Sequence, residues 1–103
     1  MSWGLAIEEA VRFHGHLGLW LLMGCRAGEI AKSRLKPSNL HELHCIVRVP
    51  NGVPHSCSID GVQASTSCTL GEGDIVVERG EGFEFAFINK ASKEVLRLRV
   101  KKA

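Results

Sequence analysis

The longest helix that the sequence predicts covers residues 18–35, GLWLLMGCRAGEIAKSRL. Apolar side chains recur along it at helical spacing, and Lys36-Pro37 follows, so the pattern predicts a helix that ends before the proline. The residues expected to face inward are Leu19, Leu22, Met23, Ile30 and Ala31. The first half is apolar nearly all round and contains Gly24 and Gly28, which would let another backbone approach closely. We expect this half of the helix to be covered by other parts of the protein on both sides, and a second subunit is one candidate for the covering part.

A shorter amphipathic helix precedes this segment. Its apolar stripe consists of Trp3, Ile7, Ala10 and Val11. Ser2 can serve as the N-cap, and the pattern ends near His14.

After the long helix, residues 43–49 alternate apolar and polar side chains, which predicts a strand with Cys45 and Val47 on its inner face. Residues 56–64 can form a short helix. Turns rich in glycine or polar residues then separate three further strands, near residues 74–78, 83–87 and 95–100. This order predicts an α+β fold in a single domain, residues 1–103, with a largely antiparallel or mixed sheet covered by helices on one side.

Composition narrows the class of protein. The 103 residues fit one domain, and 45% apolar and 23% charged residues are typical of a soluble globular chain. A formal net charge of +2 is too small to indicate a nucleic-acid partner. The longest apolar run, residues 17–23, is too short to span a membrane. The N-terminus lacks the pattern of a signal peptide, so we expect a cytoplasmic protein whose cysteines are thiols.

Two stretches carry side chains that could bind a metal or take part in catalysis. Residues 12–18, RFHGHLG, place two imidazoles one glycine apart, and residues 57–71 place Cys57 and Asp60 on one helical face. Gln63 lies near that face, and Cys68 follows the helix in a loop of small hydroxyl residues. Because Zn(II) prefers imidazole and thiolate ligands in a tetrahedral site, the predicted metal ligands are His14, His16, Cys57 and Cys68. Three ligands would leave a catalytic position open, and four would close the site.

For the remaining histidines and cysteines we expect structural or supporting roles. Cys25 and Cys45 are predicted to be buried core thiols, because cysteine is among the most buried residue types. His41 and His44 are expected to face solvent without a special role. His55, two positions before Cys57, is a candidate hydrogen-bond donor to a ligand.

Several stretches together resemble the FmdE family, whose name refers to molybdenum formylmethanofuran dehydrogenase. They are Phe13-His14-Gly15-His16, Gly24 with Arg26-Ala27-Gly28, Cys57-x-x-Asp60-x-x-Gln63, Cys68-Thr69-Leu70-Gly71-x-Gly73 and Phe87-Ile88-Asn89-Lys90. The resemblance implies an α+β core domain that tends to dimerise. It also implies a metal or active-site cluster of His14, His16, Cys57 and Cys68, with Asp60 and Gln63 beside it.

The sequence departs from the family pattern at two places. Gly18 stands where the family usually has a cysteine after the histidine pair, so one candidate ligand or nucleophile is absent. The sequence ends at Ala103 without the C-terminal zinc ribbon of many members. We expect a core domain with an altered site.

Three functions follow as hypotheses. The first is a small metal-binding protein, with zinc the expected metal, that serves as an accessory or metal-handling module for molybdenum or tungsten enzymes. The second is a metal- or thiolate-dependent enzyme of unknown substrate, with Cys57, His16 and Asp60 as the catalytic candidates. The third is a structural homodimer without bound metal. None of these hypotheses includes a nucleic-acid or membrane partner.

Overall fold

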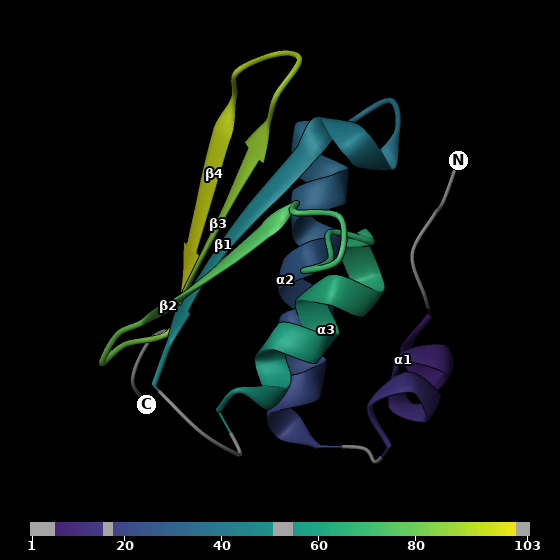
Figure 1. The fold of residues 1–103 in the computed structure, drawn as a ribbon, viewed down its shortest axis with the longest axis vertical. Coiled ribbons are helices and arrows are strands. Elements are labelled where there is room, and N and C mark those ends of the chain that lie inside the picture. The colour runs from purple at the N-terminus through teal and green to yellow at the C-terminus, as the bar shows by residue number, and fades with distance from the viewer. Residues whose placement is uncertain (1–5, 16–17, 51–54, 101–103) are drawn as a thin grey trace.

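The computed structural model describes residues 6–15, 18–50 and 55–100. Three α-helices, one short 3-10 helix and four strands lie in these ranges (Figure 1). In chain order they are α1 (Ile7–His14), α2 (Leu19–Leu35), η1 (Leu40–Glu42), β1 (Leu43–Val49), α3 (Cys57–Thr66), β2 (Ile75–Arg79), β3 (Glu84–Asn89) and β4 (Val95–Arg99). The α+β class and the element order agree with the sequence prediction.

The first helix ends inside the His-Gly-His stretch. Gly15 adopts a left-handed conformation with φ of 112°, and its N–H donates to the Val11 carbonyl at 2.7 Å. Glycine reaches this conformation without the steric cost that a Cβ would bring. The glycine between the two histidines therefore terminates α1 and leaves His14 as its last helical residue.

The helices α2 and α3 run side by side in the same direction with their backbones in close contact. Gly24 lies against Ser58 and Gly61, and a Cβ built on Gly24 would come within 2.1 Å of the Ser58 carbonyl oxygen. Further along, Gly28 lies against the side chains of Ser65 and Thr66. The close approach predicted for the glycines of α2 is thus made by α3 of the same chain, and these glycines give no indication of a second subunit.

The inward face of α2 differs from the predicted one. Its buried residues are Leu21, Gly24, Cys25, Ala27, Gly28, Ala31 and Leu35, whereas Leu19 is 66% exposed. Leu22, Met23 and Ile30 are only half-buried. The prediction was right for Ala31, which is fully buried, and wrong for Leu19. It missed the glycines, because the surface of α2 that packs on α3 contains small residues that allow close approach.

The four strands form one mixed sheet in the order β2-β1-β3-β4. β1 pairs with β2 in parallel through the crossover helix α3, and the β1–β3 and β3–β4 pairs are antiparallel. Alternate β1 residues from Leu43 to Val49 are buried, as the sequence alternation predicted.

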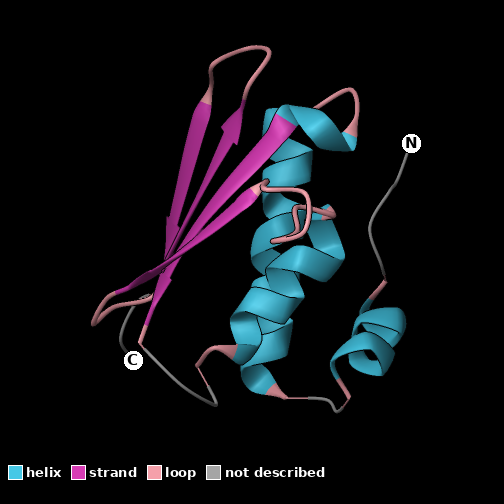
Figure 2. Cartoon of the chain, viewed as in Figure 1, coloured by secondary structure: helices cyan, strands magenta, loops and turns pink. Residues whose placement is uncertain are grey.

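The chain forms three layers, with α2 and α3 between the sheet and α1 (Figure 2). The larger apolar cluster fills the space between the sheet and the two middle helices, and it includes Leu43, Val47, Val62, Phe85 and Phe87. The smaller cluster joins α1 to the middle layer through residues that include Ala10, Leu21, Cys25 and Ala64. The opposite face of the sheet has no helix from the described residues over it. This arrangement brings the beginnings of α2 and α3 to the same end of the molecule as the end of α1.

Candidate functional site

The strongest polar contact at this shared end joins α1 to α3. His14 Nδ1 lies 2.6 Å from Asp60 Oδ2, and only 10% of the His14 side chain is exposed. Because an ionised carboxylate can only accept a hydrogen bond, Nδ1 is the donor, and the neutral ring then carries its lone pair on Nε2. Nε2 is itself buried. The contact fixes both the orientation and the tautomer of the His14 imidazole.

A second hydrogen bond continues from Asp60 along the same helix. Gln63 Nε2 donates to Asp60 Oδ1 at 3.4 Å, and Gln63 Oε1 accepts from the Leu70 N–H at 3.1 Å. The amide therefore connects the carboxylate to the loop that follows α3. Both oxygens of Asp60 have partners, so the carboxylate is held in place for His14.

Cys57 is the first residue of α3, and its side chain is almost completely buried. It precedes Asp60 by one helical turn, and so it lies at the same end of α3 as the His14–Asp60 pair. His16, the other predicted ligand from the histidine pair, lies outside the described residues.

Cys68 lies at the opposite end of α3. The helix has 10 residues, which corresponds to a length of about 15 Å. Cys68 is 0% exposed, and its Sγ donates to the Leu43 carbonyl at 3.2 Å. The fold therefore does not bring Cys68 to Cys57 or His14 within one chain.

The environment of Cys68 is the core under β1. A hydrogen bond from Cys45 lowers the pKa of the Cys68 thiol, and the same bond together with burial raises the pKa of Cys45. Thr66 Oγ1 accepts the Cys68 N–H at 3.1 Å and lies 3.9 Å from Cys45 Sγ. Cys68 and Cys45 are a pair of buried thiols between the sheet and α3.

The His14–Asp60 contact is of the kind found beside metal-binding histidines. A metal-binding histidine usually donates its other ring N–H to a carboxylate, as His14 does to Asp60. However, His14, Cys57 and Cys68 do not form a three-ligand cluster among the residues that the structure describes. The donor chemistry of His14 and Cys57 suits a borderline-soft metal, and the position of Cys68 does not fit the same site.

Gly18 is the N-cap of α2, in an extended conformation with φ of −151°. A cysteine at this position, which the family resemblance leads us to expect, would lie at the shared N-terminal end of α2 and α3. The substitution therefore removes a thiol from the end that also contains His14, Cys57 and Asp60.

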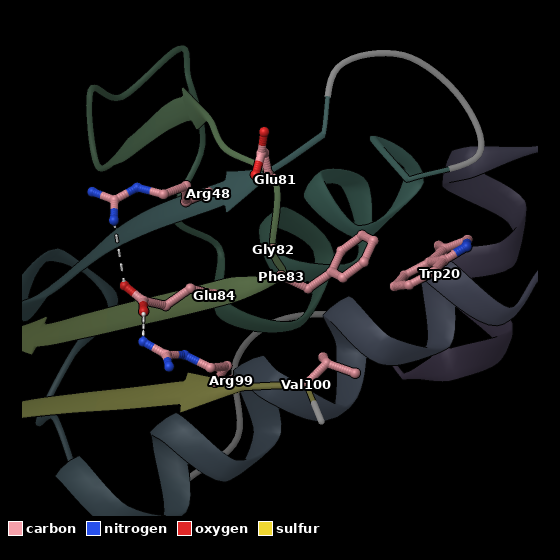
Figure 3. Close-up of a pocket in the computed structure, with 8 residues that line it drawn as sticks. All are labelled: Trp20, Arg48, Glu81, Gly82, Phe83, Glu84, Arg99 and Val100. Atoms are coloured by element: carbon pink, nitrogen blue, oxygen red, sulfur yellow. Dashed lines mark hydrogen bonds and ion pairs between the residues drawn. The ribbon is translucent and has the colours of Figure 1, made fainter. Parts of the chain in front are cut away.

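An open pocket of about 850 Å³ lies on the sheet side of the same end (Figure 3). Trp20, from the first turn of α2, stacks on Phe83 with a centroid distance of 4.3 Å, and His55 contacts both rings at 5.1 Å. The opposite rim carries Arg48, Glu84 and Arg99. The observed contacts of the His55 ring are thus with two aromatic side chains, which composition and spacing could not reveal.

The other predicted cysteines and histidines are distributed as follows. Cys25 and Cys45 are buried, as predicted, and burial is the main cause that raises the pKa of Cys25, followed by the nearby Glu29 carboxylate. His44 is half-buried on the outer face of β1. His41 lies in η1 and is exposed, but it lies 3.5 Å from a carboxylate oxygen of Glu72, a contact that the sequence analysis did not anticipate.

Two further residues of the quoted stretches have structural roles that the sequence analysis missed. The buried Asn89 side chain donates to the Leu35 carbonyl at 3.0 Å, which satisfies the end of α2. Its Oδ1 accepts the Ala91 N–H at 2.9 Å. Lys90 Nζ lies 3.3 Å from Asp74 Oδ1. The sequence did predict a turn after Asn89, and the asparagine itself was the available signal, because its side chain often accepts a hydrogen bond from the backbone two residues on.

Comparison with known proteins identifies the family. A search of curated protein sequences found no significant match, and no helix in the described ranges combines the length and apolar character needed to cross a bilayer. The family model described as FmdE, Molybdenum formylmethanofuran dehydrogenase operon, matches residues 13–103. This match begins at the His-Gly-His stretch and includes every element from α2 to β4. The chain belongs to the FmdE family.

Proposed function

We propose that this chain is a cytoplasmic metal-binding protein, with zinc as its metal, and that it serves molybdenum or tungsten enzymes of the formylmethanofuran dehydrogenase type. It would act as an accessory or metal-handling module that contacts subunits of such an enzyme. The family match to that operon supports the enzyme class. The single observation that carries the metal assignment is the 2.6 Å contact between His14 Nδ1 and Asp60 Oδ2.

The proposed ligands in one chain are His14, His16 and Cys57. His14 would bind through Nε2, because Asp60 accepts the proton on Nδ1. Cys57 would bind as a thiolate at the start of α3. Cys68 belonged to the predicted set, but its place in the core leaves the fourth position to water, a substrate or a group from a partner.

The test is the metal content of untagged protein, measured by mass spectrometry, together with a Co(II) titration. We expect one tightly bound metal ion per chain to remain through purification of the wild type, and we expect this ion to be lost in His14→Ala and Cys57→Ser. Asp60→Asn should weaken binding by roughly 10- to 100-fold, because a neutral amide replaces the carboxylate that orients His14 and raises its basicity.

Cys25→Ala is the matched control. It removes a buried thiol from α2 without touching the proposed ligands, so metal content should stay at the wild-type value. Wild-type protein that binds neither Zn(II) nor Co(II) at micromolar concentration would contradict the metal assignment.

The second candidate is a thiolate-dependent enzyme, and the same His14–Asp60 contact favours it. A base held by a carboxylate is the usual arrangement next to a nucleophilic thiol, for which Cys57 is the candidate. The discriminating measurement is the rate of Cys57 alkylation against pH in metal-free protein. A reactive thiolate below pH ~8 that is lost in Asp60→Asn supports an enzyme, and a profile centred near the free-thiol value of about 8.5 counts against it.

We also propose that the protein forms a homodimer through the open face of the sheet. Across this face the aligned residues Glu78, Arg48, Glu84 and Arg99 alternate in charge. The same row of a second copy, related by a two-fold axis that runs along the strands, would oppose it in reverse order and so with complementary charges. Light scattering should give a dimer at micromolar concentration and a monomer for Ile46→Glu, in the middle strand β1. A monomeric wild type would contradict this assignment.

A further inference from the structure

A second group of metal-binding side chains lies away from the His14–Asp60 end. His41, Glu72 and Asp74 each offer one ligand atom, and these atoms all lie within 4.8 Å of one another. Metal–ligand bonds of about 2.1 Å place ligand atoms roughly 3 to 4 Å apart, so only small side-chain movements would close the group around an ion. The set combines the imidazole of η1 with two carboxylates from the loop between α3 and β2.

Local hydrogen bonds hold each of these segments. The His41 N–H donates to Asn39 Oδ1 at 2.9 Å, and the Glu72 N–H donates to Thr69 Oγ1 at 3.2 Å. The Asp74 N–H donates to the Thr69 carbonyl at 3.2 Å, while the Asp74 carbonyl accepts an N–H of the adjacent strand β1 at 2.9 Å. The backbone positions of the three side chains are therefore set by the fold rather than by an ion.

The charge distribution around these three side chains favours the binding of a cation. The Asp74 side chain is only 9% exposed, and its Oδ1 lies 3.3 Å from the Lys90 ammonium, which is about half exposed. A buried carboxylate is costly without a positive partner. Lys90 supplies that charge from a flexible side chain, and it can move into solvent when another cation arrives. His41 and Glu72 are exposed, so an ion has direct access.

We propose that His41, Glu72 and Asp74 form a second site, for a divalent cation such as Mn²⁺ or Zn²⁺. When no metal is bound, the Lys90 ammonium pairs with the Asp74 carboxylate in its place. One nitrogen and two carboxylate oxygens suit these ions, and the remaining coordination positions go to water. The site shares no residue with the metal site proposed at His14 and Cys57, and it stands on different contacts.

The test is a titration of the full ¹⁵N-labelled chain with Mn²⁺, which broadens amide signals near the bound ion. The Cys57→Ser variant is used so that the site at His14 does not compete. We expect selective broadening at residues 41, 72, 74 and 90. His41→Gln and Glu72→Gln should each weaken Mn²⁺ binding by at least about tenfold, and both residues are exposed, so neither change threatens folding.

Two controls separate the outcomes. Glu81→Gln removes an exposed carboxylate elsewhere and should leave Mn²⁺ affinity unchanged. Lys90→Met removes the competing ammonium, so Mn²⁺ should bind more tightly and raise the Tm more than in the wild type. Absence of broadening at these four amides at millimolar Mn²⁺, or affinities unchanged in His41→Gln and Glu72→Gln, would overturn the proposal. Neither result would bear on the metal content assigned to His14 and Cys57.

Discussion

The two ends of α3 carry similar residues in opposite settings. At its beginning, Cys57 lies one turn before Asp60, whose carboxylate accepts a hydrogen bond from His14 on another helix. Just beyond its end, Cys68 is completely buried and its thiol contacts core groups, among them the Leu43 carbonyl and Cys45. Both cysteines are buried, yet only the first lies beside a titratable pair that reaches between helices. Burial alone therefore does not indicate the role of a thiol, which depends on the groups that surround it.

The difference follows from the direction of α3. The helix runs parallel to α2, with its first turns against Gly24 and its last turns against Gly28. Its N-terminal end therefore lies beside the end of α1, and its C-terminal end lies under the sheet. Helix N-termini favour negative charge, which suits a carboxylate and a thiolate at the first end. The second end is part of the core, where small hydroxyl groups satisfy themselves within the helix, as Ser65 does with the Gly61 carbonyl at 2.8 Å.

The largest effect is expected from breaking the packing that holds both ends. In Gly61→Ala the new Cβ would lie 2.3 Å from the Leu21 carbonyl oxygen. Alanine gains about 1 kcal/mol of helix propensity, so a net loss must come from this contact. We expect unfolding by urea to report a loss of about 3 kcal/mol. The control Gly82→Ala, with no atom within 4 Å of its Cβ, should stay within about 0.5 kcal/mol of wild type.

A matched pair of cysteine substitutions tests the difference between the two ends of α3 directly. Cys68→Ala removes a fully buried thiol and its hydrogen bond to Leu43, and should lower the free energy of unfolding by about 2 kcal/mol. Cys57→Ala, at the start of the helix, should cost less than about 1 kcal/mol. Metal content should instead fall in Cys57→Ala and stay at the wild-type value in Cys68→Ala. If Cys57→Ala proves the more destabilising of the two, the distinction between the two ends is wrong.

The pH dependence of stability tests the buried end alone. The hydrogen bond to Cys68, together with burial, raises the pKa of Cys45 above its usual value, so the folded chain keeps a proton that the unfolded chain loses above pH ~8.5. This contribution is complete below that pH and falls as the pH rises. The pKa of Cys68 moves downward, so its contribution grows with pH up to the ordinary thiol value and adds no loss above it.

We therefore expect the free energy of unfolding of the wild type to fall by about 1 kcal/mol more than that of Cys45→Ala between pH ~8 and ~10. Urea titrations at both pH values measure the difference. Equal slopes for the two proteins would indicate that the Cys45 thiol ionises in the fold as it does in the unfolded chain.

The smallest effect is expected at the link between the two ends. Gln63→Ala removes the hydrogen bonds to Asp60 and to the Leu70 N–H, both at least partly open to solvent. The loss should be about 0.5 to 1 kcal/mol. Faster hydrogen exchange of the Leu70 amide would accompany it. The exchange of the Cys68 amide, whose N–H donates to Thr66 Oγ1, should not change.

Local patterns predicted the secondary structure well. The alternation in residues 43–49 became β1 with every second side chain buried, and the helix predicted for residues 56–64 was observed as α3 over Cys57–Thr66. Each of these signals depends on residues that lie near one another in the chain, which periodicity can detect. The strand order β2-β1-β3-β4 and the parallel β1–β2 pair depend on contacts between distant segments, and no local pattern encodes them.

The candidate site was predicted in part. The spacing of Cys57, Asp60 and Gln63 correctly placed them near one another on a helix, because a helix turn is a local property. Placing Cys68 with them was a different kind of inference, since it required a loop to reverse toward the helix start. The structure has the loop continue into β2 instead, and Cys68 stays in the core. The zinc assignment itself remains a prediction.

Sequence patterns predicted which segments are helices and strands, that the first helix ends near His14, and which residue types could bind a metal, because these properties depend on neighbours in the chain. The contact of His14 with Asp60 agrees with the family resemblance, which placed Asp60 beside the histidines. The contacts of Cys68 with Cys45 and of His41 with Glu72 and Asp74 were found only in the folded chain. Each of these contacts joins segments that are distant in sequence. Their position follows from how α2 packs on α3, where glycines rather than large apolar side chains set the distance between the two helices.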